Sequence, residues 1–442
     1  MTRRSTSMPD ALVLLLGGQV IGQVERAGNR FSFVYDEEWR ERGPVIPLSM
    51  SMPLSGAKYG QDIISNWMWG LLTDNQNVLA RIASQNGVSA GNAFALLWAI
   101  GEDCPGAVQF AEPGRIGAMA QGRDIHWLDD LEVGARLAGL RRDYSTGRSN
   151  GEGQFSLPGA QPKTALALVD GRWGVPSGRI PTTHILKPPI PGLAGHAENE
   201  VFCLRLAERV GLRAARAEVR EFAGEPAIVV ERYDRARLPD GDIVRVHQED
   251  MCQAMGVHPF GKYENDGGPG IRRVMDLLSW SSNPEADRRR FMQAIALNFL
   301  IAGTDAHAKN YSVLFGPRQA RLAPLYDVAS YLPYVEGRWQ DVPMPMKIDK
   351  CDRYAAVMPR HWERMARGCG YPADEALGHV ARLVAAVPDT AADVAAGLRA
   401  QGVRHPVLAV LVDKIAWRCT EVGRIWGLTK PDPEPKPVGP GK

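Results

Sequence analysis

The sequence contains no apolar run long enough to cross a membrane, since a spanning helix needs about 20 apolar residues in succession. The stretch ALVLLL at residues 11–16 follows Arg3 and Arg4 as the core of a signal peptide would. It is short, however, and no small-residue cleavage site follows it. Gly17 and Gly18 end the run as tight turns require, so we expect a β-hairpin here rather than a leader peptide.

Cysteine is scarce and scattered. The six cysteines form no C-x-x-C pair, so the sequence indicates neither a zinc site nor a disulfide framework. Unpaired thiols are typical of a reducing compartment, and we therefore expect a cytoplasmic protein.

Neither sign of charge dominates, because 52 lysines and arginines balance 50 aspartates and glutamates, for a net charge of +2. This balance excludes a protein whose whole surface binds nucleic acid, and the basic cluster at 288–290 is typical of a solvated helix face. With 45% apolar and 23% charged residues, the chain fits none of the disordered, collagen-like and coiled-coil classes. A chain of 442 residues without internal repeats exceeds one hydrophobic core, so we expect two or three units that share a cleft.

The pattern of apolar residues changes twice along the chain. Residues 1–110 alternate strands and turns with helix-like segments at NWMWGLLTDN and NAFALLWAI, which predicts a β-rich α/β module. Residues 151–231 are strand-rich (TALALV, HILK, PAIVVER) and contain one helix, ENEVFCLRLAERVG, that Gly211 should end. Beyond about residue 248 the apolar spacing is mainly helical, and residues 431–442 should be a mobile tail rich in Pro and Lys. The expected fold class is α+β.

The clearest chemical signal is GTDAHAKN at residues 303–310, directly after an apolar helix pattern. Four residues separate Asp305 from Asn310. Protein kinases use this spacing in the catalytic loop, where the Asp accepts the substrate hydroxyl proton and the Asn binds a metal ion. The stretches YSVLF and RLAPLY then read as a hairpin joined at GPRQ, which would bring Asn310 beside Asp327. Oxygen ligands from two such side chains suit Mg²⁺.

Other interpretations of these residues are open. Asp and Asn are common in helix caps and turns, so Asp305 alone would more often cap a helix than catalyse. His307 could ligate a metal ion, but a single His without a partner at ligand spacing is more often structural. The order and spacing of the acidic residues favour the kinase interpretation.

A glycine-containing loop lies upstream of a candidate lysine. In GEGQFSLPGAQPKTALALV, Gly151, Gly153 and Gly159 could let backbone amides approach phosphates. The segment matches neither Walker A nor the kinase G-x-G-x-x-G pattern, and a flexible surface loop is the simpler interpretation. Lys187, at the end of THILK, would point its amine toward the α and β phosphates; a surface lysine is the alternative.

The next helix and strand complete a kinase-like order. Glu198 and Glu200 open the helix, and either could pair with Lys187 or only favour the helix N-terminus; we predict Glu200 as the partner. The strand PAIVVER leads into residues 231–233, where a hinge between two lobes would meet adenine. Glycine loop, lysine, helix glutamate, hinge, catalytic loop and metal-binding Asp follow one another as in protein kinases.

These stretches resemble the signature segments of the HipA family of toxin serine/threonine kinases from type II toxin–antitoxin systems. The segments are SLPGAQPK, THILK, VERYDR, QEDMCQAMG, TDAHAKN and LAPLYDV, together with YENDGGPGI, PLSMSMPL and WGLLTDN, so the resemblance covers nearly the whole chain. It implies a protein-kinase-like, two-lobed fold. Residues 1–110 would form the amino-terminal β-rich domain, 111–235 the nucleotide lobe and 236–430 the helical lobe.

The resemblance also implies residue roles, with ATP and Mg²⁺ as ligands. Asp305 would accept the proton, and Asn310 and Asp327 would hold the magnesium. Ser156 matches the family's autophosphorylated serine, and its phosphate would add about −1.5 to −2 charge beside the ATP phosphates and expel the loop. Pro158 stands where the family often has alanine, which removes one amide donor from the loop. The implied ATP contacts are Pro158, Gly159, Ala160, Gln161, Pro162, Lys163, Lys187, Glu231, Arg232, Tyr233, His307, Asn310, Tyr326 and Asp327.

The family further implies partners and a cellular role. Its toxins are neutralised by a small helix-turn-helix antitoxin, HipB-like, and two copies of each chain repress their own operon by binding operator DNA. Family substrates include aminoacyl-tRNA synthetases, notably glutamate–tRNA ligase, whose phosphorylation inhibits translation and produces growth arrest and persistence.

Two other functions stay open at this point. One is a small-molecule kinase of the aminoglycoside phosphotransferase type, against which the extra amino-terminal domain argues. The other is a catalytically silent repressor partner, against which the intact residues Lys187, Asp305, Asn310 and Asp327 argue.

Overall fold

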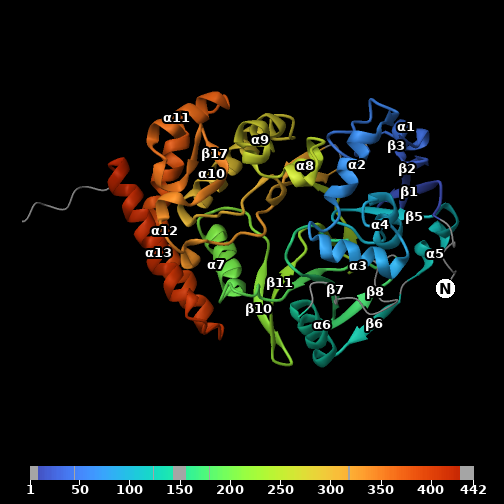
Figure 1. Cartoon of the computed structure of the whole chain (residues 1–442), viewed down its shortest axis with the longest axis horizontal. Coiled ribbons are helices and arrows are strands. Elements are labelled where there is room, and N and C mark those ends of the chain that lie inside the picture. The colour runs from blue at the N-terminus through green and yellow to red at the C-terminus, as the bar shows by residue number, and fades with distance from the viewer. Residues whose placement is uncertain are drawn as a thin grey trace, which may run out of the picture.

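The structure is a computed structural model that describes residues 8–43, 45–122, 124–142, 156–178, 180–316 and 319–428. Gly151 and Gly153 of the glycine-containing loop, the arginines before the first strand and the expected tail lie outside these ranges. Figure 1 shows the amino-terminal elements (blue) and the last helices (orange and red) on opposite sides, with the green strands of the middle region below and between them.

The amino-terminal unit is built on a five-stranded antiparallel sheet of order β4-β3-β2-β1-β5. The expected hairpin is present: Gly17 and Gly18, with φ of 57° and 80°, join β1 to β2, and such positive angles are what a two-residue hairpin turn demands. Helices and strands together bury a core that includes Trp67 and Phe94. The strands are β1 (Ala11–Leu16), β2 (Gln19–Ala27), β3 (Arg30–Tyr35), β4 (Lys58–Tyr59) and β5 (Val108–Ala111), and the helices are α1 (Glu37–Glu41), α2 (Gln61–Gly70), α3 (Gln76–Asn86) and α4 (Ala93–Ile100).

The second sheet has six strands in the order β10-β11-β9-β7-β8-β6. The predicted helix is α7, and the chain leaves it through Gly211, whose φ of 90° suits a glycine after a helix end. β8 and β10 are additional to the predicted strands. The elements of this region are α5 (Ile116–Gln121), β6 (Ile125–Leu128), α6 (Asp130–Arg142), β7 (Thr164–Val169), β8 (Arg172–Pro176), β9 (His184–Lys187), α7 (His196–Arg209), β10 (Ala217–Phe222) and β11 (Glu225–Glu231).

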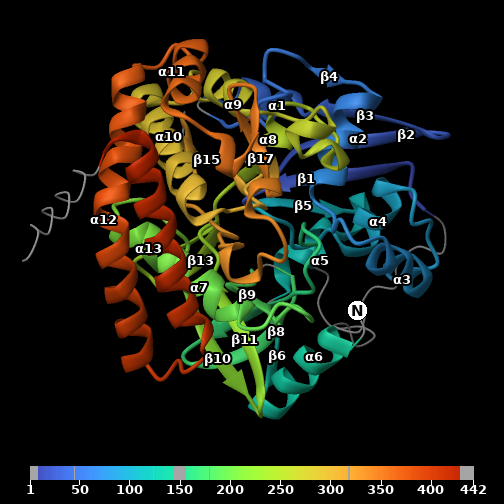
Figure 2. The ribbon, with the colours of Figure 1, turned by 60° about the vertical axis from the view of Figure 1, so that its left-hand side comes forward.

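Beyond residue 248 the chain is mainly helical, as predicted. The helices α10, α12 and α13 lie side by side in Figures 1 and 2, around a core that includes Phe291, Phe299 and Trp362. The helices are α8 (Met251–Ala254), α9 (Ile271–Leu278), α10 (Pro284–Ile301), α11 (Pro359–Gly368), α12 (Ala373–Ala400) and α13 (Val407–Trp426). Small antiparallel sheets pair β12 (Arg235–Arg237) with β13 (Ile243–Arg245), β15 (Ser312–Gly316) with both β14 (Gln248–Asp250) and β16 (Gln319–Leu322), and β17 (Pro343–Ile348) with β18 (Cys351–Arg353).

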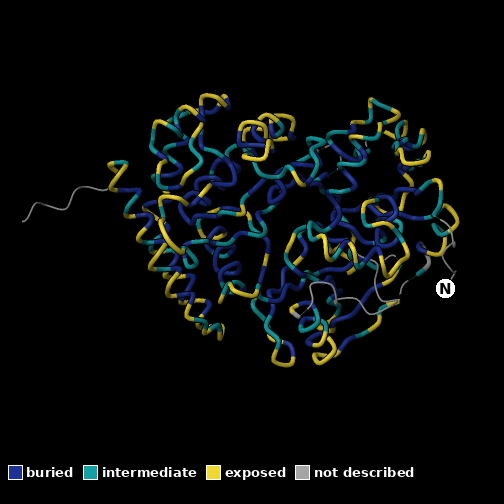
Figure 3. Tube along the Cα trace, in the orientation of Figure 1, coloured by how far each residue is buried: buried dark blue, intermediate teal, exposed yellow. Residues whose placement is uncertain are grey.

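Two predicted elements end earlier than expected. The helix at NWMWGLLTDN stops at Gly70, so residues 71–75 form a loop, and the strand at RLAPLY stops at Leu322. Pro324 has no N–H to donate to a sheet, which explains the second difference. Figure 3 shows buried backbone toward the middle of the molecule and exposed residues at its rim. Among the described residues, no helix combines the length and apolar character that a bilayer span requires.

Candidate active site

A cavity of about 430 Å³ lies where the three regions of the chain meet. Its walls include Asp74 from the amino-terminal unit, Lys187 from the second sheet and Asp305 from the segment after α10. All the residues that the sequence predicts as ATP contacts line this cavity: Pro158, Gly159, Ala160, Gln161, Pro162, Lys163, Lys187, Glu231, Arg232, Tyr233, His307, Asn310, Tyr326 and Asp327.

Lys187 stands between two carboxylates. Its Nζ lies 2.8 Å from Glu200 Oε1 and 2.7 Å from Asp327 Oδ1, so Glu200 in α7, rather than Glu198, is the helix glutamate in contact. Desolvation alone would raise the pKa of Asp327, but the ammonium groups of Lys187 and Lys163 outweigh it and hold this pKa well below its ordinary value. Lys187 and Asp327 are therefore both charged at neutral pH, which is what the predicted roles of an amine that binds phosphate and a carboxylate that binds metal require.

The position of Asp305 follows from how α10 begins and ends. Asn283 caps the helix start by accepting a hydrogen bond from the Ala286 amide at 3.1 Å, and Ala302, with φ of 51°, turns the chain out of the helix at its other end. Asp305 follows in the turn, with its side chain 66% exposed at the mouth of the cleft. The Tyr263 hydroxyl donates to Asp305 Oδ1 at 2.7 Å, which fixes one oxygen and leaves the other for a substrate hydroxyl.

The charges around Asp305 favour proton acceptance. Desolvation by the cleft walls, followed by the negative charge of Asp327, raises the pKa of Asp305 above its ordinary value. A higher pKa makes a carboxylate a better base, provided that it stays ionised at the working pH.

His307 is a buried neutral imidazole. Desolvation, followed by the nearby charges of Lys262 and Lys309, lowers the pKa of His307 to about 3. Its Nδ1 is buried without a hydrogen-bond partner among the described residues. Among the same residues, no three His, Cys, Asp or Glu side chains gather as a metal site.

Asn310 and Asp327 are neighbours, as the predicted hairpin requires. Asn310 Nδ2 donates to the Asp327 carbonyl at 3.4 Å. Tyr326 is held by hydrogen bonds of 2.6 Å to Ser312 Oγ and to the Lys309 carbonyl. One amide and one carboxylate offer few oxygen ligands, and this donor set fits Mg²⁺, which completes its shell with water and phosphate oxygens.

The loop 156–163 is docked against the amino-terminal unit. Gly159, with φ of 98°, presents its carbonyl to Thr73 Oγ1 at 2.8 Å and to the Asp74 amide at 3.3 Å. Lys163 Nζ closes the loop by donating to the Pro158 carbonyl at 2.6 Å. Desolvation lowers the pKa of Lys163 to about 8, so most of these side chains are still cationic at neutral pH. Gln161 fixes the outer end of the loop through a 3.1 Å hydrogen bond from Nε2 to the Pro188 carbonyl.

Ser156 is only 1% exposed. Its hydroxyl donates to the Leu71 carbonyl at 2.7 Å, and its amide donates to the Asp103 carbonyl at 2.8 Å. A buried serine with a satisfied hydroxyl cannot attack a phosphate where it stands. Any phosphorylation of Ser156 therefore requires the loop to leave this position.

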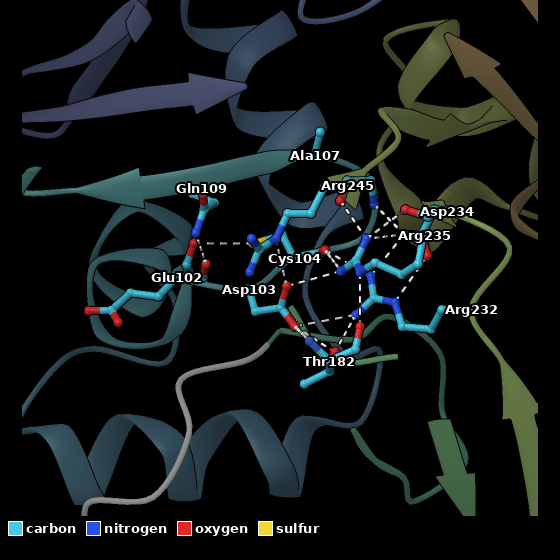
Figure 4. A network of polar contacts seen from close by, with 12 residues as sticks. Glu102, Asp103, Cys104, Ala107, Gln109, Thr182, Arg232, Asp234, Arg235 and Arg245 are labelled. Atoms are coloured by element: carbon cyan, nitrogen blue, oxygen red, sulfur yellow. Dashed lines mark hydrogen bonds and ion pairs between the residues drawn. The ribbon is translucent and has the colours of Figure 1, made fainter. Parts of the chain in front are cut away.

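The predicted hinge, residues 231–233, is anchored to the amino-terminal unit (Figure 4). The Arg232 guanidinium is occupied by the Asp234 carboxylate at 2.8 Å, Thr182 Oγ1 at 2.8 Å and the Cys104 carbonyl at 2.9 Å. The predicted adenine contact at this residue is therefore left to its backbone. Asp103, in the loop before β5, lies 3.0 Å from Arg235 and 3.1 Å from Arg245. Desolvation would raise the pKa of Asp103, but the three guanidinium groups outweigh it and lower the pKa below its usual range.

Several cleft residues were not predicted from the sequence. Asp74 contacts Lys262 Nζ at 2.8 Å and Lys309 Nζ at 2.6 Å, and Tyr263 contacts Asp305. Lys309 and Asp74 lie within the segments TDAHAKN and WGLLTDN, but no local spacing signals that these two segments meet.

Comparisons with known proteins agree with this architecture. The family model described as the HipA-like C-terminal domain matches residues 155–391, and the one described as the HipA N-terminal domain matches residues 12–111. The chain is 37% identical to Y4mE of Sinorhizobium fredii, which is named as a kinase, over 80% of this chain and 84% of that protein. It is 29% identical to the serine/threonine-protein kinase toxin HipA of Shewanella oneidensis, over 88% of this chain and 90% of that protein.

A solved structure shows the same fold. The complex of Shewanella oneidensis HipA with HipB and its operator DNA contains a chain that superimposes with a TM-score of 0.80 at 25% identity. The match covers 95% of this chain and 100% of that one.

Proposed function

Because the chain belongs to the HipA family and is a kinase of that family, we propose that it transfers the γ-phosphoryl group of ATP, with Mg²⁺, to a serine or threonine hydroxyl of a protein. The observation that carries the proposal is the position of Lys187 between Glu200 and Asp327, at 2.8 and 2.7 Å, across one cavity from Asp305. Protein kinases use the same lysine–glutamate pair and metal-binding Asp to orient ATP.

Each residue of the cleft has its own role in the proposed reaction. Lys187 and Lys163 bind phosphate oxygens, the backbone of residues 231–233 meets the adenine, and His307 and Tyr326 line the nucleotide pocket. Asp305 accepts the proton of the attacking hydroxyl while Tyr263 holds its carboxylate in place. Asn310 and Asp327 would hold Mg²⁺, which neutralises charge on the phosphates when it is bound.

The proposed biological role is that of a toxin. The relative from Shewanella oneidensis is named as a toxin kinase, and the matching solved chain is bound to HipB and operator DNA. By this similarity the chain binds a HipB-like antitoxin, two copies of each acting as a corepressor on operator DNA. The favoured substrate is an aminoacyl-tRNA synthetase, glutamate–tRNA ligase first, in the cytoplasm, where its phosphorylation arrests translation and growth. Residues 1–110, 111–235 and 236–430 are the proposed domains.

Ser156 is the proposed autophosphorylation site. A phosphate adds about −1.5 to −2 charge, and neither the charge nor the volume fits a buried position that is 1% exposed. Phosphorylated Ser156 therefore cannot return to its buried position. The loop 156–163 then no longer lines the cleft, and the kinase is inactive.

Incubation with labelled ATP, Mg²⁺ and a panel of purified aminoacyl-tRNA synthetases, followed by phosphopeptide mapping, tests the proposal. Label should appear on one synthetase and on Ser156, and should be absent with Asp305→Ala. Transfer to an aminoglycoside in place of protein would support a small-molecule kinase. ATP binding without any transfer would support a silent repressor partner.

A further inference from the structure

The loop 71–74, which joins α2 to α3, touches both sides of the cleft. On one side its Thr73 hydroxyl holds the Gly159 carbonyl at 2.8 Å. On the other side the Asp74 carboxylate reaches Lys262 through Oδ2 at 2.8 Å and Lys309 through Oδ1 at 2.6 Å. One short loop of the amino-terminal unit thus connects the phosphate-side loop to the catalytic segment.

Both lysines lie next to residues of the proposed catalytic centre. Lys309 belongs to the same segment as Asp305, directly precedes Asn310, and is 6% exposed. Lys262 directly precedes Tyr263, whose hydroxyl donates to Asp305 at 2.7 Å. Both ammonium-bearing side chains line the cavity. They approach it from the helical lobe, whereas Lys187 approaches from the second sheet.

The shared carboxylate leaves the two ammonium groups able to bind an anion. An ammonium carries three N–H donors, and Asp74 accepts one from each lysine. Desolvation alone would raise the pKa of Asp74, but Lys309 and Lys262 outweigh it and lower this pKa, so the carboxylate is charged and fixes both amines. An ion pair between units would need only one lysine, and Asp74 by itself neutralises only one of the two cations. Lys262 also interacts with the Asp305 carboxylate, and an anion bound in the cavity would further offset the cost of burying both ammonium groups.

Resting on the proposed kinase function, we propose that Lys262 and Lys309 contact the phosphoryl group in transit, and that Asp74 is a positioning residue that holds both amines there. In this step the bond between the γ-phosphorus and the β–γ bridging oxygen breaks and the acceptor oxygen bonds to phosphorus. The acceptor proton goes to Asp305, and the lysines exchange none. Charge on the transferring group is thereby stabilised by preorganised donors. The amino-terminal unit is then part of the catalytic apparatus.

The test uses the full chain carrying Ser156→Ala, so that loop phosphorylation cannot change the rate. Single-turnover release of labelled phosphate from ATP–Mg²⁺ to water is measured beside ATP affinity. Asp74→Asn keeps the shape and removes the charge, so it should lower the rate at saturating ATP by about tenfold or more and change the Kd by less than about threefold. Asp62→Asn, the same change at an exposed position of α2, should leave both unchanged.

A double-mutant cycle separates positioning from general stability. In a Lys309→Met background, Asp74→Asn should have a smaller effect than in the parent chain, because one of the two contacts through which Asp74 acts is already absent and only the one to Lys262 is left to lose. Lys262→Met should also slow the reaction, which keeps the proposal testable if Asp74→Asn folds poorly. Parent-like rates in Asp74→Asn and Lys262→Met, with only a lower melting temperature, would overturn the inference. Failure of the parent chain to transfer phosphate from ATP either to water or to any synthetase of the panel would instead overturn the proposed function on which the inference rests.

Discussion

At the scale of single residues, Glu249 in β14 is an acid placed where it must be neutral. It is fully buried, and it accepts hydrogen bonds from the Met50 amide at 2.7 Å and from Trp67 Nε1 at 3.3 Å, both in the amino-terminal unit. Burial raises the pKa of Glu249 from 4.5 to about 8. The folded protein therefore carries a proton on Glu249 that the unfolded chain has lost at neutral pH.

The expected result is a stability that falls as the pH rises. Between about pH 4.5 and about pH 8 the native state binds more protons at this site than the unfolded state, so the free energy of unfolding decreases with pH. Glu249→Gln mimics the neutral acid and should remove this contribution, so the variant gains stability relative to wild type toward alkaline pH. Urea unfolding of both proteins near pH 5 and near pH 8 measures this difference in unfolding free energy.

Glu208→Gln, at an exposed position of α7, is the matched control. The free energy of unfolding of this variant should equal that of wild type at both pH values. A constant difference in unfolding free energy between wild type and Glu249→Gln at the two pH values would contradict a neutral Glu249.

At the scale of elements, the docking of the loop 156–163 controls access to Ser156. The Thr73 hydroxyl donates to the Gly159 carbonyl at 2.8 Å and accepts from the Asn75 amide at 3.2 Å. Thr73→Val removes both bonds without changing the shape of the side chain, and only the bond to Gly159 holds the loop 156–163. Losing one such hydrogen bond costs about 1 kcal/mol, or about fivefold in the population of the released loop. Phosphorylation of Ser156 should therefore become up to about fivefold faster, as quantified by phosphopeptide mass spectrometry.

Thr390→Val provides the comparison, since the Thr390 hydroxyl donates within its own helix, to the Ala386 carbonyl at 2.7 Å, at a half-buried position of α12. In Thr390→Val, Ser156 should be phosphorylated at the wild-type rate. An unchanged or slower rate in Thr73→Val would show that this contact does not limit the release of the loop.

Elements that carry their own local signal could be predicted from the sequence. The hairpin of β1 and β2, helix α7 with its terminal Gly211, and the spacing of Asp305 and Asn310 all depend on residues a few positions apart. β10 could not, because half of the residues of AEVREF are charged and the strand lies at the edge of its sheet, which weakens the apolar alternation. The strand at RLAPLY was predicted too long because Pro324 stops it.

The contributions of the amino-terminal unit to the site could not be read from the sequence. The bonds from Asp74 to Lys262 and Lys309 join residues 188 and 235 positions apart. Nothing local to WGLLTDN specifies such partners, so only the assembled fold brings them together. Lys187, Glu200 and Asp327 could be predicted because kinases keep their order along the chain.

At the scale of the whole molecule, Asp103 joins the amino-terminal unit to the hinge (Figure 4). It is 7% exposed and lies within 3.5 Å of Arg232, Arg235 and Arg245. Asp103→Asn would leave three buried guanidinium groups with Asp234 as the nearby carboxylate. Removing one partner of a buried ion pair costs about 3–5 kcal/mol, and we expect a loss of this size in the free energy of unfolding.

Urea unfolding followed separately by tryptophan fluorescence and by circular dichroism measures this effect. Asp389→Asn, at an exposed position of α12, should change the unfolding free energy by less than about 0.5 kcal/mol. An equally small change in Asp103→Asn would contradict a structural role for the network.

The central claim is that the cleft transfers phosphate with Asp305 as the base. It is tested most directly by comparing wild type with Asp305→Asn for both ATP affinity and single-turnover transfer of labelled γ-phosphate. The account predicts an ATP affinity within about threefold of wild type and a transfer rate lower by about 10²–10⁴-fold, the usual contribution of a general base. Transfer at the wild-type rate in Asp305→Asn would contradict it.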